Sequence, residues 1–319
     1  MSDDLVVGVD IGGTKIAAGL VDARGAIKRQ SRAPMAASGS AEHGLSAVIT
    51  AVDSLLAETG SRKSIRGIGV CAPGPLDPKT GTILNPPNLT CWRNFPLAAR
   101  MSQHFDVPVK VDNDGNAAAL AEAQWGAGRG YRNVFYATIG TGIVFDGKIY
   151  HGRTGAAAEG GHVSIDYHGP RCACGKHGCI EVLAAGPAIA RRAHAKVASD
   201  PVRGAALLAL AGGRAESVSS EMVGKAFAEG DPLAEEILLE TTQLLTYWLG
   251  NIIDLLEPDV IIIGGGVSGM LAPFFEKIRA GLPACSINPR AQEIPIVQAF
   301  YAADAGIAGG AALGWGGES

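Results

Sequence analysis

Three cysteines lie within the short stretch Cys172-Ala-Cys-Gly-Lys-His-Gly-Cys179. Glu159-Gly-Gly-His162 lies just upstream, and Glu181 follows the last cysteine by two positions. Zinc binds thiolates and imidazoles, and four protein ligands leave it no open position for chemistry. The spacing therefore predicts a closed, structural zinc site made by the three cysteines and one histidine. His162, His168 and His177 are the candidate imidazoles.

Carboxylates and amides gather at the end of an apolar segment, in Val111-Asp-Asn-Asp-Gly-Asn116. A carboxylate at the end of a strand can face a cleft and accept a proton from a bound hydroxyl. The alanine-rich stretch that follows predicts a helix, and either Asp114 or Asn116 could cap its first turn. Capping and catalysis are compatible roles for one residue here.

Three glycine-rich turns could approach phosphate groups. Asp10-Ile-Gly12-Gly13-Thr14-Lys15 joins two strands, Gly140-Thr141-Gly142 forms a second turn, and Gly264-Gly265-Gly266 forms a third. Glycines allow backbone N–H groups to approach an anion closely, and the carboxylate of Asp10 could hold a hydrated Mg²⁺. The alternative is an ordinary glycine-rich hairpin. Three such turns in one chain favour a nucleotide-binding site, in which two turns contact the phosphates and one contacts the adenosine.

The elements that must position these residues follow a repeated plan. Residues 5–22 predict a strand, a turn and a strand, and residues 134–150 predict the same, with Asp146-Gly147 as a hairpin turn. Residues 260–263 predict a buried strand that leads into the third glycine turn. The pattern predicts an α/β protein with two sheet-containing domains.

Helical periodicity and helix-forming composition predict five helices. They cover residues 41–59, 97–105, 116–124, 183–196 and 233–255. The last is the most regular, and Pro258 follows its end.

Composition excludes several classes of protein. The 319 residues are 47% hydrophobic and 18% charged, with a net charge of −4. No basic cluster indicates a nucleic-acid surface, and no apolar run approaches the roughly 20 residues of a membrane helix. The N-terminus lacks the pattern of a signal peptide, so we expect a cytoplasmic protein. In that compartment, clustered cysteines favour a metal over disulfides.

The order of the motifs resembles that of the ROK family of sugar kinases, and within it bacterial zinc-containing glucokinases. The motifs are Asp10-Ile-Gly-Gly-Thr-Lys15, Ala72-Pro-Gly-Pro75, Asp112-Asn-Asp114, Gly140-Thr-Gly142, Glu159-x-x-His162, Cys172-x-Cys174 and Cys179-x-Glu181. The resemblance extends from Val7 to about Ala312. It implies an actin/hexokinase-like fold of two ribonuclease-H-like domains, with ATP and sugar in the cleft between them. We expect residues 1–115 and 301–319 to form the smaller domain and residues 116–300 to form the larger, zinc-containing one.

The resemblance also implies roles for individual residues. Asp114 would be the catalytic base, and His162 would join Cys172, Cys174 and Cys179 as the zinc ligands. The sugar would be bound by Asn88, Asn113, Asp114, Glu159, His162 and Glu181. ATP and Mg²⁺ would be bound by Asp10, Gly12, Gly13, Thr14, Lys15, Thr138, Gly140, Thr141, Gly142, Gly265 and Gly266.

The implied reaction is ATP-dependent phosphorylation of the 6-hydroxyl of glucose. N-acetylmannosamine or N-acetylglucosamine is an alternative substrate. The chain departs from the family after Gly142, where Ile143-Val-Phe follows directly and the turn is shorter, so a catalytically weak sugar-binding protein is a further alternative. Few residues precede Asp10, so we do not expect the DNA-binding domain of a ROK repressor. The long apolar helix at 233–255 favours a homodimer.

Overall fold

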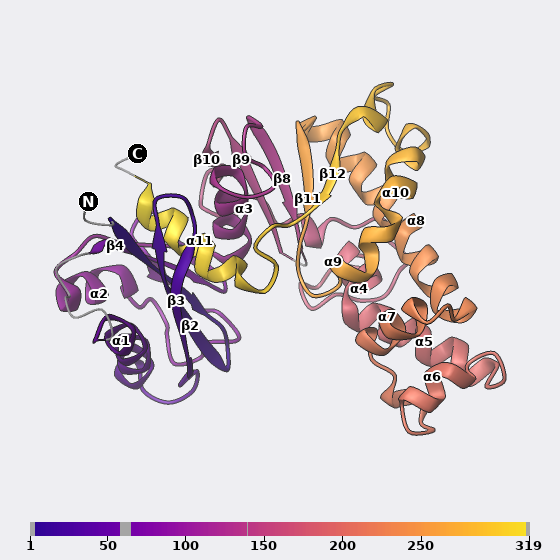
Figure 1. The fold of residues 1–319 in the computed structure, drawn as a ribbon, viewed down its shortest axis with the longest axis horizontal. Helices are drawn as coiled ribbons and strands as arrows, with labels where there is room; N and C mark the ends of the chain where they lie inside the picture. Colours follow the sequence, from indigo (N-terminus) through magenta and orange to yellow (C-terminus); the bar gives the residue numbers. More distant parts are fainter. Residues whose placement is uncertain (1–3, 58–64, 139, 317–319) are drawn as a thin grey trace. The chain divides into compact units, whose positions relative to one another are not determined.

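The computed structural model describes residues 4–57, 65–138 and 140–316, and it confirms the α/β class. The chain divides into two compact units. The first comprises Met1–Tyr136, Gly140–Ala158 and Ala299–Ser319, and the second comprises Ala137–Ile139 and Glu159–Gln298. Figure 1 shows the elements of both units, coloured along the sequence.

The first sheet has the strand order β3-β2-β1-β4-β7. Its strands are β1 (Leu5–Ile11), β2 (Lys15–Asp22), β3 (Ile27–Pro34), β4 (Ile65–Ala72) and β7 (Val109–Asn113). β1, β2 and β3 pair antiparallel, whereas β4 and β7 continue the sheet in parallel from β1. The strand–turn–strand unit predicted for residues 5–22 is therefore confirmed.

The second sheet repeats this plan with the order β10-β9-β8-β11-β12. Its strands are β8 (Asn133–Ala137), β9 (Thr141–Phe145), β10 (Lys148–Ile149), β11 (Val260–Ile263) and β12 (Ile296–Gln298). Asp146 and Gly147 have φ values of 49° and 75°, the left-handed conformation that a tight hairpin turn requires. A two-stranded sheet, β5 (Leu76–Asp77) with β6 (Thr82–Ile83), completes the strands of the described residues. In both large sheets a hairpin precedes two parallel strands, as the predicted duplication requires.

The helices agree with the predictions in position more closely than at their ends. The α-helices are α1 (Ala41–Ala57), α2 (Leu97–Phe105), α3 (Asp114–Gln124), α4 (Ile180–Ala184), α5 (Gly186–Ser199), α6 (Ala205–Leu210), α7 (Ser220–Ala228), α8 (Pro232–Leu256), α9 (Ser268–Leu271), α10 (Phe275–Gly281) and α11 (Ala305–Trp315). The helix predicted for 183–196 is confirmed as α5 from Gly186 onward. Its first two residues instead end the separate helix α4, because α5 begins at the Gly186-Pro187 step. The last two residues of the predicted helix 41–59 lie outside the described residues.

The alternation of side chains along β1 explains which face of the sheet Asp10 lies on. Val7, Val9 and Ile11 point into the core that contains α1, whereas successive side chains of a strand point to opposite faces. Gly8 and Asp10 therefore face α11. A Cβ atom at Gly8 would lie 1.9 Å from the carbonyl oxygen of Ile307, so α11 packs directly on the backbone of β1.

The compact units end at other residues than the predicted domains. The first unit extends past residue 115 to Tyr136 and also includes Gly140–Ala158. The predicted boundary at residue 115 instead falls between the two large sheets, because β7 ends at Asn113 and β8 begins at Asn133. The division at residues 115 and 301 stays a prediction.

Candidate functional site

Two carboxylates of the first unit lie close enough to influence each other. Burial raises the pKa of Asp10, and the negative charge of Asp114 raises it further, while Lys15 acts in the opposite direction. The buried thiol of Cys71 lies 3.6 Å from Oδ1 of Asp10 and 3.1 Å from the carbonyl oxygen of Gly306. Asp10 at the end of β1 thus lies beside the end of β4 and the start of α11.

Asp114 begins α3, directly after β7. Its Oδ1 accepts a hydrogen bond from the backbone N–H of Gly115 at 2.8 Å. Although the residue is exposed at the surface, desolvation by the surrounding chain raises the pKa of its carboxyl group. A carboxylate of raised pKa that is still open to solvent can accept a proton from a bound hydroxyl.

The cap of α3 differs from both alternatives suggested by the sequence. Asn113 is the N-cap, and its Oδ1 accepts from the backbone N–H of Gly115 at 2.9 Å. Asp114 and Asn116 are inside the helix. The N-cap position belongs to Asn113 because its backbone is still extended, with φ −66° and ψ 148°, as a capping residue requires.

The first glycine turn is a tight hairpin between β1 and β2. The backbone N–H of Gly12 donates to the carbonyl of Lys15 at 2.9 Å. Gly13 lies against Asn88, since a Cβ atom at Gly13 would be 3.1 Å from the Asn88 carbonyl oxygen. Thr14 and Lys15 are exposed. The structure therefore brings the predicted phosphate turn next to one predicted sugar ligand.

The second glycine turn lies beside Asp114. A Cβ atom at Gly140 would lie 3.8 Å from Oδ1 of Asp114. Thr141 already belongs to β9 and is buried, and its hydroxyl donates a short hydrogen bond to the carbonyl of Ala158. The hydroxyl of Thr141 is thus engaged within the protein.

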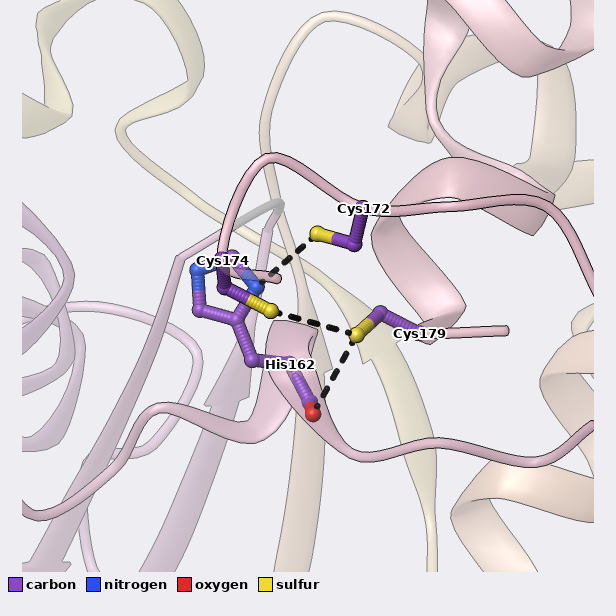
Figure 2. A group of neighbouring side chains, drawn as sticks. All are labelled: His162, Cys172, Cys174 and Cys179. Atoms are coloured by element: carbon purple, nitrogen blue, oxygen red, sulfur yellow. Dashed lines mark hydrogen bonds between the residues drawn. The ribbon is translucent and has the colours of Figure 1, made fainter. Parts of the chain in front are cut away.

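The predicted metal ligands lie together in the second unit. One ligand atom from each of His162, Cys172, Cys174 and Cys179 lies within 4.8 Å of the others. Figure 2 shows these four side chains gathered together. Nδ1 of His162 is 3.6 Å from Sγ of Cys172, and Sγ of Cys174 is 3.6 Å from Sγ of Cys179. Ligands of a tetrahedral zinc with Zn–S bonds of about 2.3 Å are separated by roughly 3.8 Å. The four residues fit a zinc ion, and His162 rather than His168 or His177 supplies the imidazole.

Glu181 connects this cluster to its surroundings. Its Oε2 is 3.2 Å from Nδ1 of His162 and 3.7 Å from Sγ of Cys172.

The indole N–H of Trp248 donates to the carbonyl of Gly160 at 3.1 Å, which anchors the short turn between Glu159 and His162 to α8. Glu159 itself is exposed.

A mainly apolar cavity of about 220 Å³ lies in the second unit. Thr138, Gly265 and Gly266 line it, together with Trp248 and the first residues of α5. Three of the predicted nucleotide contacts therefore share one cavity. The remaining wall of the cavity could not be predicted from the sequence, because apolar residues of α8 and α9 look like ordinary core residues.

Sequence reasoning overlooked further residues around Asp10 and Asp114. Cys71 is a buried core residue whose thiol also contacts Asp10. Asp112 and His151 form a close pair at 2.5 Å. Asp112 stands in the motif that contains Asp114, whereas nothing in the sequence around His151 indicates its partner.

Comparison with known proteins gives consistent results. The ROK family profile matches residues 6–315. A glucokinase of Streptomyces coelicolor is 33% identical over 97% of this chain and 97% of its own length. An N-acetylmannosamine kinase of Escherichia coli is 31% identical over 97% of both chains. The crystal structure of a ROK glucokinase from Streptomyces griseus, in complex with glucose and AMPPNP, is 34% identical with a TM-score of 0.80, covering 96% of this chain and 98% of that one. The expected actin/hexokinase-like fold is thereby confirmed.

Proposed function

The chain belongs to the ROK family, and from this premise we propose that it is a glucokinase, which transfers the γ-phosphoryl group of ATP to the 6-hydroxyl of glucose. The observation that carries the proposal is the carboxylate of Asp114, fixed at the start of α3 with a raised pKa and lying beside Asp10 and the Gly140 turn. Similarity to glucokinases over nearly the whole chain supports it.

Transfer of a phosphoryl group needs an oriented hydroxyl, an acceptor for its proton and charge stabilisation around the phosphates. In the proposed reaction, Asp114 accepts the proton of the sugar hydroxyl as that oxygen attacks the γ-phosphorus. Its raised pKa makes it a stronger base than an ordinary aspartate. The amide of Asn113, whose Oδ1 is held by the N–H of Gly115, orients the sugar.

The carboxylate of Asp10 fits a hydrated Mg²⁺. It is partly buried. Desolvation and the neighbouring charge of Asp114 both raise its pKa, so a hard cation would relieve the repulsion between the two groups. When bound, Mg²⁺ neutralises charge that develops on the phosphates. The N–H of Gly12 is engaged by the Lys15 carbonyl, so the first turn would bind phosphate through the backbone N–H groups of Gly13 and Thr14. The Gly140–Gly142 turn would add further donors, and Lys15 adds a positive charge.

The second unit would supply further sugar ligands. Glu159, His162 and Glu181 offer acceptors and donors suited to hydroxyl groups, and Asn88 is a further candidate from the first unit. A structural zinc held by His162 and the three cysteines would fix where Glu181 and the turn after Glu159 lie. The 220 Å³ cavity lined by Thr138, Gly265 and Gly266 suits the nucleoside of ATP, since its walls are mainly apolar.

A second candidate function is phosphorylation of N-acetylmannosamine. It is favoured by the full-length similarity to N-acetylmannosamine kinases of Escherichia coli. Initial rates of ADP release over a panel of glucose, mannose, N-acetylglucosamine and N-acetylmannosamine distinguish the two. Turnover of glucose with the highest kcat/KM is the expected result, and a preference for an N-acetylhexosamine replaces the first proposal by the second.

The decisive test replaces the proposed base. Asp114→Asn keeps the size of the side chain but cannot accept a proton, so kcat should fall about 10²- to 10⁴-fold, while glucose binding measured by calorimetry persists. Asp146→Asn is the matched control, because Asp146 lies in an exposed hairpin turn whose left-handed backbone suits Asn. Asp114→Asn with the turnover of the wild type refutes the assignment, and wild-type protein that binds glucose without phosphorylating it favours the weak sugar-binding alternative.

A further inference from the structure

Asp112 is a carboxylate that the proposed reaction does not use, although it directly precedes Asn113 and Asp114. It is only 3% exposed, and a buried charge is tolerated in proteins only where it is paired and hydrogen-bonded. The residue lies on β7 opposite Cys71 of β4. Its burial so close to the proposed base calls for a physical reason.

Both oxygens of Asp112 are occupied. Oδ1 accepts the backbone N–H of Asn113 at 2.7 Å and the side-chain amide of Asn116 at 3.1 Å. Oδ2 lies 2.5 Å from Nε2 of His151. One carboxylate thus connects the end of β7, the first turn of α3 and the loop after β10.

His151 is suited to pair with this carboxylate. Its side chain is about one-third exposed, and the hydrogen bond to Asp112 raises its pKa, opposed by partial burial and by the positive charge of Lys79. The backbone carbonyl of His151 accepts the N–H of Ala157 at 3.2 Å, so the loop that carries the imidazole is itself closed by a hydrogen bond.

The groups that Asp112 fixes are the neighbours of the proposed base. The N–H of Asn113 belongs to the peptide that joins Asp112 to Asn113, the residue directly before Asp114. Asn116 lies in the first turn of the helix that begins at Asp114. Since Asn113 and Asp114 both accept from the N–H of Gly115, a rotation of that peptide would move both side chains. A misplacement of about 1 Å can cost about 100-fold in rate.

We propose that Asp112 and His151 are positioning residues, which hold the Asn113–Asp114 segment in the geometry needed for proton transfer. The inference rests on the proposed function, in which Asp114 is the base. Neither residue is assigned a contact with sugar or nucleotide. Their loss should therefore lower kcat much more than it changes KM.

The experiment compares two substitutions of His151 in the full-length protein. His151→Phe keeps a ring but loses the donor to Asp112, so kcat should fall about 10- to 100-fold, with KM for glucose and ATP within about twofold of the wild type. His151→Gln keeps a donor and should recover kcat to within about threefold. His104→Gln is the matched control, because His104 forms a looser, exposed pair with Asp53 at 3.4 Å, and it should leave kcat unchanged.

The outcomes separate this inference from the proposed function. Active wild-type protein and inactive Asp114→Asn support the proposed function; with those results, wild-type kcat in His151→Phe overturns only the positioning role. Equal losses in His151→Phe and His151→Gln, or a parallel change of kcat and KM, indicate a merely structural pair and also overturn it. If His151→Phe does not fold, Asp112→Asn tests the positioning role instead. A loss of about tenfold in kcat is then expected, and an unchanged kcat contradicts the proposal. Wild-type protein without kinase activity on any sugar overturns both.

Discussion

At the scale of single residues, environment rather than residue type distinguishes the carboxylates of the first unit. Asp112 is fully engaged by hydrogen bonds and a histidine, whereas Asp114 remains open to solvent with a raised pKa. Asp10 lies between a buried thiol and the start of α11. Three aspartates on neighbouring strand ends can therefore perform three different tasks.

The raised pKa of Asp114 predicts an acid limb in the activity profile. Only the ionised carboxylate accepts a proton, so kcat should be constant near neutral pH and fall as pH decreases through a pKa above the ordinary value of 3.8. Initial rates between pH 3.5 and 8, at saturating glucose, ATP and Mg²⁺, measure this limb. A kcat that stays constant down to the lowest pH would contradict the environment described for Asp114.

At the scale of elements, α11 and the first sheet approach each other through glycines. A Cβ atom at Gly69 on β4 would lie 1.8 Å from the carbonyl oxygen of Gly310 on α11. Since the same helix begins beside Asp10, this packing sets the place of the proposed Mg²⁺ ligand relative to the sheet. The small residues of α11, near the end of the chain, are thus required for this close packing.

Gly69→Ala should therefore destabilise the protein strongly, by several kcal/mol or to the point of no soluble product, because two backbones must separate to admit a methyl group. Thermal unfolding followed by circular dichroism measures the effect. Gly269→Ala is the control, since a Cβ atom there would have no neighbour closer than 4.0 Å. A melting temperature for Gly69→Ala equal to that of the control would show that α11 does not pack this closely.

The cysteine cluster is the second element with a direct test. Purified protein should contain about one zinc per chain, and a strong chelator should lower the melting temperature, because metal binding contributes to folding. Cys174→Ser should lose the metal, while Cys285→Ser, which alters a cysteine outside the cluster, should retain it. Metal analysis by mass spectrometry decides, and metal-free protein of unchanged stability rules out a structural zinc.

At the scale of the whole molecule, both units contribute residues to the proposed reaction. Ligands that bind only the folded state should raise its stability, by about 2.7 kcal/mol at a ligand concentration 100 times Kd. Glucose and a non-hydrolysable ATP analogue should each raise the melting temperature, which differential scanning fluorimetry measures. Galactose is the control sugar, and an equal shift with galactose would count against a site specific for glucose.

The homodimer expected from the sequence stays a prediction. Tyr247 and Leu255 on α8 are 63% and 77% exposed, as a helix that packs against a second copy would require. Light scattering should give about twice the chain mass of 32.7 kDa. A monomeric mass at micromolar concentration would show that these side chains face solvent.

Within the described residues, no helix is both long and apolar enough to cross a membrane.

Elements whose signals are local could be predicted from the amino-acid sequence alone. Hairpin turns such as Asp146-Gly147, the periodicity of α8 and the spacing of the three cysteines follow from backbone preferences and metal geometry, which act over a few residues. The family motifs added the expectation that His162 joins the three cysteines, with which it clusters in the structure. They also indicated where the base and the phosphate turns lie along the chain.

Contacts between residues far apart in the chain became known only from the folded structure. The pairing of Asp112 with His151, the contact of Cys71 with Asp10 and the apolar cavity next to Gly265 join segments far apart in the chain, so no local pattern could reveal them. The capping role of Asn113, rather than Asp114 or Asn116, likewise depends on where β7 ends. Burial and hydrogen bonding, which set the pKa values of these carboxylates, arise only when the sheet and its helices pack together.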